Sequence, residues 1–277
     1  MKIIEPKVEL LSEIGISPES HIARCARVCY GKECKEPNQE ADRKMVKGLV
    51  KRGHLSMFRH ASIYISDLQY ASRYLQNHIN HSPYWNYNID IGYVSTNFQE
   101  ANEIERESVT LVDNKQFLKE CAKHPELFEL YRMTFCITTQ ISTSRELNRV
   151  SPNNIAERST RYCSSKDGLE ICKPWWYDKD EHGLNQRDYN QYCRFAEEGY
   201  NRLLENGMKP EDARGILPLD TATKVIYTYS VQEWKHIIDL RYYGTTGRPH
   251  PNAKLVIGMV RNQINQFAKE NNIDFQV

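Results

Sequence analysis

The segment 144–162, SRELNRVSPNNIAERSTRY, contains four arginines and ends in the run Ser159-Thr160-Arg161-Tyr162. A guanidinium is a planar fork that pairs with two phosphate oxygens at once, and serine or threonine hydroxyls donate to the oxygens that remain. An aromatic ring beside them can lie against a flat base. The run therefore has the chemistry of a site for a nucleotide phosphate, although a solvated helix end is the simpler explanation of its composition.

The charge of the chain is almost balanced, with 37 Lys and Arg residues against 36 Asp and Glu residues and a formal net charge of +1. Such a chain has no general attraction for nucleic acid or a membrane surface, so any anion site must be local. No apolar run approaches the roughly 18–20 residues of a membrane helix, and acidic residues interrupt the start of the chain, where a signal peptide would be apolar. We therefore expect a cytoplasmic protein without nucleic-acid or membrane partners.

The eight cysteines include no CxxC pair, which removes the usual support for a zinc ribbon or a thioredoxin-like site. We expect reduced thiols that serve as small core residues, because a nucleophilic cysteine needs a neighbouring base that the sequence does not reveal. His78 and His81 lie three residues apart, but without further ligands we predict no metal site. The phosphate loops GxxxxGKS/T and GxGxxG and the elbow GxSxG are missing, so kinase, Rossmann dehydrogenase and α/β-hydrolase functions lack motif support.

Helical and strand patterns surround the segment 144–162. Residues 60–66, HASIYIS, alternate in the manner of a half-buried strand. Helical spacing predicts longer helices over 41–52, 125–147 and 186–206 and from Pro251 onward, with Gly53 and Gly207 as stop signals. A short helix is expected at Pro210, and Ser230 and Glu233 form a capping box that opens a helix toward Arg241. Several helices with few strands, not in βαβ order, predict an α+β fold.

The segment 144–163 resembles the signature region of the flavin-dependent thymidylate synthases. That family's motif is Arg-His-Arg, seven residues, then Ser, with Arg-Tyr shortly after. Without a gap, Arg149-Val150-Ser151 falls on Arg-His-Arg, Ser159 on the serine and Arg161-Tyr162 on Arg-Tyr. Four further segments match the family in the same order: HIARCARVCYG (21–31), RGHLSMFRHASIYI (52–65), EDARGILPLDTATKVIYTYSVQEWKHIIDLR (211–241) and RPHPNAKL (248–255).

The resemblance implies a single catalytic domain over residues 1–277, with a small, mostly antiparallel sheet and packed helices. It also implies reductive methylation of dUMP to dTMP. In this reaction methylenetetrahydrofolate supplies the carbon, reduced FAD supplies hydride and NADPH reduces the flavin. The implied assembly is a homotetramer with sites between its subunits.

The same resemblance assigns roles to residues of this chain. Ser159, Arg161 and Arg214 would hold the phosphate of dUMP. Arg241 would lie against the uracil and, with Ser159, act as the catalytic pair, because a guanidinium stabilises negative charge that develops on the ring. The full set of implied substrate-binding residues is Glu146, Arg149, Ser159, Arg161, Arg214 and Arg241. With a hydride source and an electrostatic clamp, the ring needs no cysteine nucleophile.

The flavin side departs from the family pattern. Val150 and Ser151 stand where a histidine and a second arginine serve the flavin, and Arg59 replaces a nearby glutamate. Losing a charged hydrogen bond costs on the order of 1.5–3 kcal/mol, so flavin binding requires compensation, for which Arg59 is a candidate. The implied cofactor-binding residues are His54, Ser56, Arg59 and His236.

Residues of about 68–130 form an insertion that is atypical of the family and begins rich in Tyr, Asn and His. Its aromatic residues Tyr84, Trp85 and Tyr87 either stack on a flat ring or pack the insertion itself. Two alternatives to dUMP methylation stay open. One is C5 modification of another pyrimidine nucleotide, and the other is a non-catalytic nucleotide-binding homologue that has lost the flavin.

Overall fold

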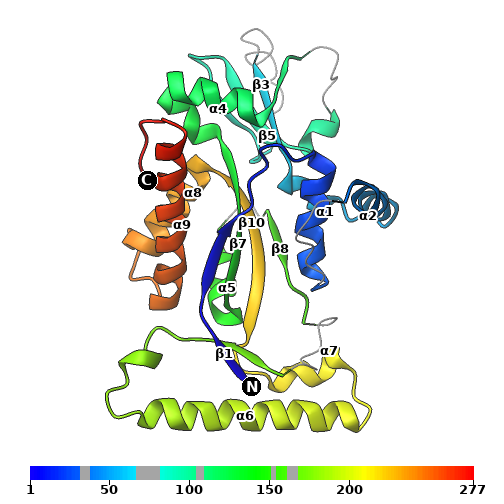
Figure 1. Ribbon diagram of the computed structural model, residues 1–277, viewed down its shortest axis with the longest axis vertical. Helices are drawn as coiled ribbons and strands as arrows, with labels where there is room; N and C mark the ends of the chain where they lie inside the picture. The colour runs from blue at the N-terminus through cyan, green and yellow to red at the C-terminus, as the bar shows by residue number, and fades with distance from the viewer. Residues whose placement is uncertain (32–37, 67–81, 104–108, 151–153, 161–167) are drawn as a thin grey trace.

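The computed structural model describes residues 1–31, 38–66, 82–103, 109–150, 154–160 and 168–277. In this part of the chain, a central antiparallel sheet has the strand order β2-β7-β10-β8 (Figure 1). Its strands are Lys7–Leu10, Arg132–Gln140, Ala222–Ser230 and Ile155–Glu157. A second antiparallel sheet has the order β4-β5-β3-β6, with strands Asn86–Asn88, Tyr93–Asn97, Ser62–Ser66 and Leu111–Val112. A parallel pair joins β1 (Lys2–Ile4) to β9 (Glu170–Cys172).

Helices surround these sheets. The α-helices are α1 (Pro18–Cys29), α2 (Gln39–Lys51), α4 (Asn114–Lys123), α5 (Ile141–Leu147), α6 (Leu184–Glu205), α7 (Pro210–Ala213), α8 (Val231–Ile238) and α9 (Pro251–Glu270). Short 3-10 segments are η1 (Leu55–His60), η3 (Glu100–Glu103), η5 (Pro125–Leu130), η6 (Tyr177–Lys179) and η7 (Arg214–Ile216). The second sheet and α4 lie at one end of the molecule, and α6 lies at the other (Figure 1). The mixture of helices with mostly antiparallel sheets confirms the predicted α+β class.

The central sheet is covered on both faces. On one face α8 packs closely, and its Trp234 donates an indole N–H to the carbonyl oxygen of Met133 in β7 at 3.0 Å. On the other face Cys25 of α1 packs against Ile226 of β10. Figure 1 shows α9 and α1 on opposite sides of β7 and β10. The sheet is therefore a rigid inner layer from which loops and helices project the candidate residues.

The helix predicted over 125–147 is wrong in its middle. The segment forms η5, then strand β7, then α5, and all nine residues of β7 are buried. Within β7, Met133, Phe135 and Ile137 alternate with more polar residues in the period of two of a strand, but apolar residues of η5 and α5 on either side extend this short pattern into helical spacing. Several of its residues are β-branched, among them Thr134 and Ile137, which suits a strand better than a helix.

The strand predicted over 60–66 is present as β3, but it is not half-buried. Tyr64 stacks on Phe117 of α4, with ring centroids 4.1 Å apart, on one face of the second sheet. Ile65 packs with Trp85 on the other face. Because β3 lies inside the second sheet and both faces are covered, Ser62 is buried along with the apolar residues of the strand.

The other predicted long helices are present as α2, α6 and α9, and the short helix at Pro210 is present as α7. Gly53 and Gly207 follow α2 and α6 with φ angles of +70° and +88°, the left-handed conformation that favours glycine. Within the part of the chain that the structure describes, no helix combines the length and the apolarity that a bilayer crossing requires.

The segment that carries Arg241 begins at the predicted capping box. The amide of Glu233 donates to Ser230 Oγ at 3.2 Å, and the amide of Ser230 donates to Glu233 Oε2 at 2.7 Å. After α8 the backbone widens into a short π-helix, η8 (Asp239–Tyr243). Gly244 ends this segment with a φ of +75°. π-helices are rare in proteins overall, but those that occur are often found at functional sites, which is consistent with a functional role for Arg241.

The stability of the central sheet is testable at Phe135. This side chain is fully buried in β7 and meets the ring of Trp234 edge-on at 5.2 Å. We expect Phe135→Ala to lower the free energy of unfolding in urea by roughly 3–5 kcal/mol, because it leaves a cavity in a packed core. The same change at Phe195 on α6, which is 54% exposed, should cost less than about 1 kcal/mol. Equal losses in the two variants would contradict the placement of β7.

Candidate active site

One group of candidate residues lies where the chain leaves β8. The amide of Ser159 donates to the carbonyl oxygen of Cys29, the last residue of α1, at 3.0 Å. Arg214 donates from Nη1 to Thr160 Oγ1 at 2.7 Å and from Nε to the carbonyl oxygen of Glu211 at 3.0 Å. These contacts use two of the five guanidinium N–H groups. Ser159, Thr160 and Arg214 therefore form a fixed donor group suited to an anion.

A second group joins α5 to η8. Arg241 Nη2 donates to the carbonyl oxygen of Glu146 at 3.2 Å, and Nη1 lies 3.6 Å from the Glu146 carboxylate. Arg241 Nε is buried and has no hydrogen-bond partner among the described residues. Both side chains are about four-fifths buried, at 19% and 23% exposure, which strengthens their attraction relative to a pair in water. The structure thus brings together two of the predicted substrate-binding residues.

Glu157, which the sequence analysis did not select, is hydrogen-bonded to residues that flank Glu146 in sequence, and it lies two residues before Ser159. Its Oε1 accepts hydrogen bonds from Ser144 Oγ at 2.8 Å and from Thr223 Oγ1 at 3.1 Å. Its Oε2 accepts from Asn148 Nδ2 at 3.3 Å, and Asn148 Oδ1 in turn accepts from the hydroxyl of Tyr227 at 2.9 Å. One carboxylate therefore ties β8 to both α5 and β10.

This carboxylate connects the two groups. Ser144 and Asn148 flank Glu146 in sequence, and Glu157 stands two residues before Ser159. Fixing Glu157 therefore sets α5, with the Arg241 contact, relative to the Thr160–Arg214 contact. An ionisable residue between the apolar Ile155-Ala156 and Arg158 was the only signal in the sequence, and it does not reveal partners on other elements.

The described contacts do not link the other predicted substrate-binding residues to either group. Arg149 is exposed directly after α5. Arg161 lies outside the described residues, as does Ser151 of the degenerate motif. Val150 is 6% exposed and belongs to the main apolar core, so this position of the motif serves packing.

The predicted cofactor-binding residues occupy several surfaces. His54 and Ser56 are exposed in and beside η1, and His236 is exposed on α8. Arg59 donates from Nε to Gln99 Oε1 at 2.9 Å, and its guanidinium lies 4.6 Å from the centre of the Tyr84 ring. Tyr84 is thus a partner of Arg59, whereas Trp85 packs in a core and Tyr87 is 44% exposed. No described contact brings His54, Ser56 or His236 together.

A buried cation that sequence reasoning missed lies behind Arg59. Arg132 is 2% exposed and donates from Nη2 to the carbonyl oxygen of Arg59 at 3.2 Å. Its Nε and Nη1 have no hydrogen-bond partner among the described residues, although Nη1 lies 3.9 Å from Glu233 Oε2. Nδ1 of His60 shares a hydrogen bond with Thr228 Oγ1 at 2.8 Å, and its Nε2 has no hydrogen-bond partner within the described part of the chain. Burial, followed by the charges of Arg132 and Arg59, lowers the pKa of His60 to about 3, so the ring is neutral near pH 7.

Metal and thiol chemistry find little support in the described residues. No group of three or more His, Cys, Asp or Glu side chains among them is placed to hold a metal ion. Five of the six described cysteines are buried, as the sequence analysis predicted for core thiols. Burial raises the pKa of Cys25, and it raises the pKa of Cys121 and of Cys172 to about 12. These three thiols are therefore not activated nucleophiles. Cys34, Cys163, His78 and His81 lie outside the described residues.

Comparison with known proteins extends these observations. The family model described as thymidylate synthase complementing protein matches residues 9–90 and 87–267. A probable flavin-dependent thymidylate synthase of Paramecium bursaria Chlorella virus 1 is 30% identical over 156 residues, which cover 48% of this chain and 68% of that protein. The flavin-dependent thymidylate synthase of Synechocystis sp. is 24% identical over 151 residues, which cover 48% and 66% respectively.

A solved structure is similar along nearly the whole chain. The UMP/dUMP methylase PolB from Streptomyces cacaoi, bound with 5-Br dUMP, aligns over 97% of this chain and 93% of its own length. The identity is 18% and the TM-score is 0.47.

The connecting role of Glu157 is testable by substitution. Glu157→Ala removes the acceptor of two hydroxyls and one amide, and the hydroxyl of Thr223, a residue that is 2% exposed, would be left without it. We therefore expect the free energy of unfolding in urea to fall by roughly 1–3 kcal/mol. Glu157→Gln keeps one acceptor oxygen and the volume, so its loss should be smaller. Glu9→Ala, which removes an exposed carboxylate paired with Lys7, should cost less than about 1 kcal/mol. If Glu157→Ala matched Glu9→Ala, the carboxylate would not be a structural connection.

Proposed function

The chain is a divergent member of the flavin-dependent thymidylate synthase family and a methyltransferase-like enzyme, and we propose that it converts dUMP to dTMP by reductive methylation at C5. The observation that supports this proposal most is the geometry around Glu157. That carboxylate connects an arginine–hydroxyl group suited to a phosphate with a second arginine suited to a ring that gains negative charge. The matched family supplies the reaction for which such a pair of groups is useful.

In this proposal Arg214, Ser159 and Arg161 bind the phosphate of dUMP. Arg214 is held at two points, by Thr160 and by the carbonyl oxygen of Glu211, so it loses little side-chain freedom when an anion binds. Its remaining N–H groups and the Ser159 hydroxyl then supply charge-assisted hydrogen bonds. The phosphate fixes the nucleotide, and the sugar and base extend toward α5.

Arg241 acts on the base in this proposal. Glu146 orients the guanidinium through its carbonyl oxygen and its carboxylate before the nucleotide arrives. A preoriented cation stabilises negative charge on the uracil ring without having to reorganise as that charge develops. Glu146 and Arg149 also bind the nucleotide in this proposal.

FAD supplies hydride to the methyl group when it is bound, with NADPH as the reductant and methylenetetrahydrofolate as the carbon source. The residues present fit a cofactor that carries phosphate and carbonyl acceptors. Arg132 and His60 offer buried polar atoms without described partners, and Arg59 adds a cation beside them. We propose that Arg59, His54, Ser56 and His236 hold the cofactor. The homotetramer and the cytoplasmic location stay predictions.

One observation favours a second candidate, a nucleotide-binding homologue without catalysis. Val150 is packed into the core where the family motif has a histidine, so one contact to the flavin is lost. The visible spectrum of the purified protein separates the two functions. Flavin absorbance, as purified or after incubation with FAD, supports the enzyme. A colourless protein that FAD cannot reconstitute but that dUMP stabilises in thermal melts supports the binding protein.

Phosphate recognition is tested by Arg214→Ala. We expect the variant to weaken dUMP binding in isothermal titration by about 1.5–3 kcal/mol, roughly tenfold or more in Kd, because a charge-assisted contact is lost. Arg187→Ala on α6, which removes a 70% exposed guanidinium, is the matched control and should leave the Kd unchanged. Titrations of the unmodified protein with UMP and dCMP identify its preferred nucleotide.

The assignment of Arg214 fails if the folded variant binds dUMP as tightly as the unmodified protein. Circular dichroism and the urea midpoint of Arg214→Ala establish that the variant is folded. A preference for UMP or dCMP over dUMP would instead favour C5 modification of another pyrimidine nucleotide.

A further inference from the structure

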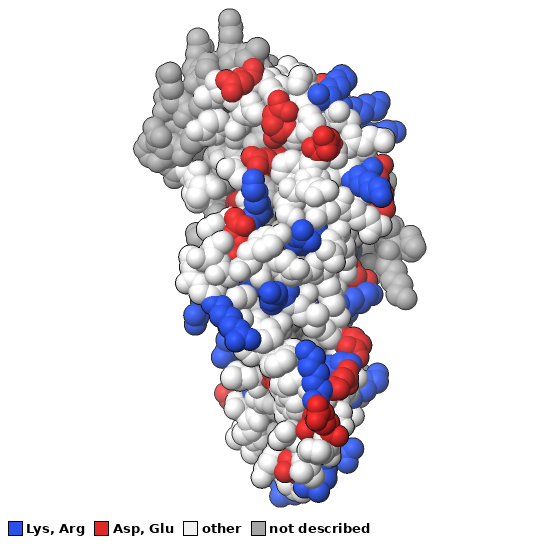
Figure 2. Space-filling view, turned by 90° about the vertical axis from the view of Figure 1, so that its left-hand side faces the viewer, with Lys and Arg blue, Asp and Glu red and all other residues white. Residues whose placement is uncertain are grey.

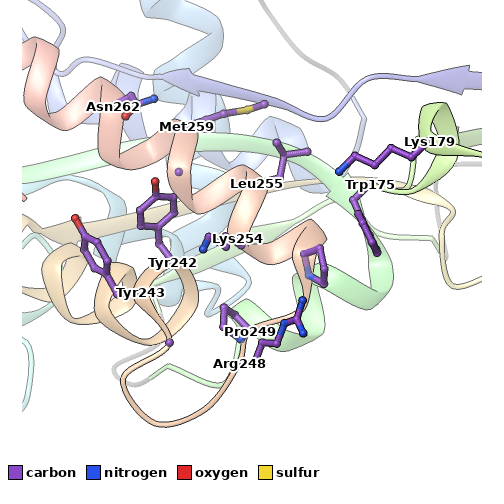
Figure 3. Close-up of a pocket in the computed structure, with 13 residues that line it drawn as sticks. Trp175, Lys179, Tyr242, Tyr243, Arg248, Pro249, Lys254, Leu255, Met259 and Asn262 are labelled. Atoms are coloured by element: carbon purple, nitrogen blue, oxygen red, sulfur yellow. The ribbon is translucent and has the colours of Figure 1, made fainter.

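Polar groups outside the nucleotide site gather on both sides of the central sheet. On the α9 side, a cavity of about 940 Å³ opens between α9, η8 and the segment around η6, and the cations that line it, Lys179, Arg248 and Lys254, stand apart (Figure 3). The face covered by α8 and α9 likewise carries dispersed Lys and Arg side chains over a largely uncharged middle (Figure 2). These three cations are exposed, and water can serve as their partner. On the α1 side the polar groups are buried, where hydrogen-bond partners are required.

A chain of hydrogen bonds runs between α1 and the central sheet. Nε2 of His21 in α1 lies 3.1 Å from Thr134 Oγ1 in β7, which lies 2.8 Å from Thr228 Oγ1 in β10. Thr228 Oγ1 lies 2.8 Å from Nδ1 of His60 at the end of η1. Thr134 and Thr228 are directly opposed in the two strands, so their side chains leave the sheet on the same face. None of the four residues is more than 1% exposed.

Arg24 determines which nitrogen of His21 carries the proton. Its Nη2 donates to the carbonyl oxygen of Ser12 at 2.9 Å and is also hydrogen-bonded to Nδ1 of His21. Because a guanidinium only donates, Nδ1 accepts. Burial, followed by the charge of Arg24, lowers the pKa of His21, so the ring is neutral near pH 7 and its one proton is on Nε2. That N–H faces Thr134 Oγ1 and, at 3.8 Å, Oε1 of Glu13.

The remaining protons of the chain follow from this first one. Thr134 accepts from His21, and the acceptor that the described contacts offer its own hydroxyl proton is Thr228 Oγ1. Thr228 then donates to Nδ1 of His60, so the one proton of the neutral His60 ring is on Nε2. The reverse direction would leave the buried hydroxyl proton of Thr134 without a described acceptor, which is unfavourable. The chain therefore makes His60 Nε2 an N–H donor.

This donor is buried and has no hydrogen-bond partner within the described part of the chain. Nε and Nη1 of Arg132 share that condition, and Arg132 is 2% exposed. The two residues are neighbours, because Nη2 of Arg132 donates to the carbonyl oxygen of Arg59, the residue before His60. A buried donor without an acceptor destabilises the fold, so several of them in one place indicate a bound group that consists of acceptors.

We propose that Arg24, acting through this chain, makes His60 a hydrogen-bond donor to the cofactor, and that His60 and Arg132 together receive one of its oxygen acceptors. The proposal rests on the proposed function, in which Arg59 holds the cofactor. Arg24, Thr134 and Thr228 are positioning residues in this arrangement. A donor at His60 also compensates in part for the histidine that Val150 replaces in the motif.

The direction of the chain is measured by ¹⁵N NMR of protein labelled at its nine histidines, with His60 assigned from the signals missing in His60→Gln. The unmodified, ligand-free protein should show His60 as a single Nε2–H tautomer. Arg24→Met should convert this signal into a mixture of both tautomers, because the chain can then donate in either direction. Thr138→Val, at a buried threonine of β7 outside the chain, is the matched control and should leave the tautomer unchanged.

The role toward the cofactor is measured by FAD titration of the full chain, followed by flavin fluorescence. His60→Leu removes the donor and should raise the FAD Kd about tenfold. His60→Gln presents an amide N–H and should recover part of that affinity, a rescue that a packing role does not predict. Thr228→Val leaves Nδ1 of His60 without its donor and should raise the FAD Kd less. The dUMP Kd should not change in these variants.

An Nδ1–H tautomer of His60 in the unmodified protein would overturn the proposal. An unchanged FAD Kd in folded His60→Leu would overturn it as well. A protein that binds dUMP but not FAD would refute the role of His60 toward the cofactor and favour the non-catalytic binding protein. Failure to bind dUMP would instead count against the proposed function, while the NMR measurement would still decide whether Arg24 sets the direction of the chain.

Discussion

The hydrogen bonds of one carboxylate, Glu157, hold together the elements that carry the two groups of residues in the proposed nucleotide site. The residue sits on the short strand β8, yet its oxygens accept from α5 and from β10. Short elements lose their register easily, and β8 pairs with β10 over three residues. A charge that satisfies three donors in a partly buried place gives this strand a fixed position that its backbone pairing alone would hold weakly. The residues that follow β8, Ser159 and Thr160, and the α5 residue Glu146 that contacts Arg241 are held in place in the same way.

Around this contact, Ser159 stands at a position that matches the family motif and is one of the residues that we propose bind the nucleotide, whereas Val150 and Arg59, on the proposed cofactor side, depart from the family pattern. Val150 has joined the apolar core, while positive charge is present at Arg59 and at the buried Arg132 behind it. Arg59 itself contacts Tyr84, which precedes β4, and Gln99, which follows β5 of the second sheet. The segments around the second sheet therefore help to hold Arg59, one of the residues that we propose bind the cofactor.

Local signals in the sequence were sufficient for the helices that end in glycine or begin with a cap, such as α2 and α8. The strand β7 was misread because its period of two is short, and the apolar residues of the neighbouring η5 and α5 continue it with helical spacing. Glu157 and Arg132 were missed for a related reason: their importance lies in partners 9 to 101 residues away in the chain, and a single sequence does not show such contacts. Family resemblance supplied Arg214 and Arg241, whose contacts with Thr160 and Glu146 the structure adds.

The central claim is that this chain replaces the hydrogen at C5 of dUMP with a methyl group, and release of tritium from [5-³H]dUMP measures that replacement directly. In the presence of FAD, NADPH and methylenetetrahydrofolate, we predict that tritium appears in water with repeated turnover and that omission of either the flavin or the folate abolishes it. A folded protein that binds FAD and dUMP but releases no tritium under these conditions would contradict the claim.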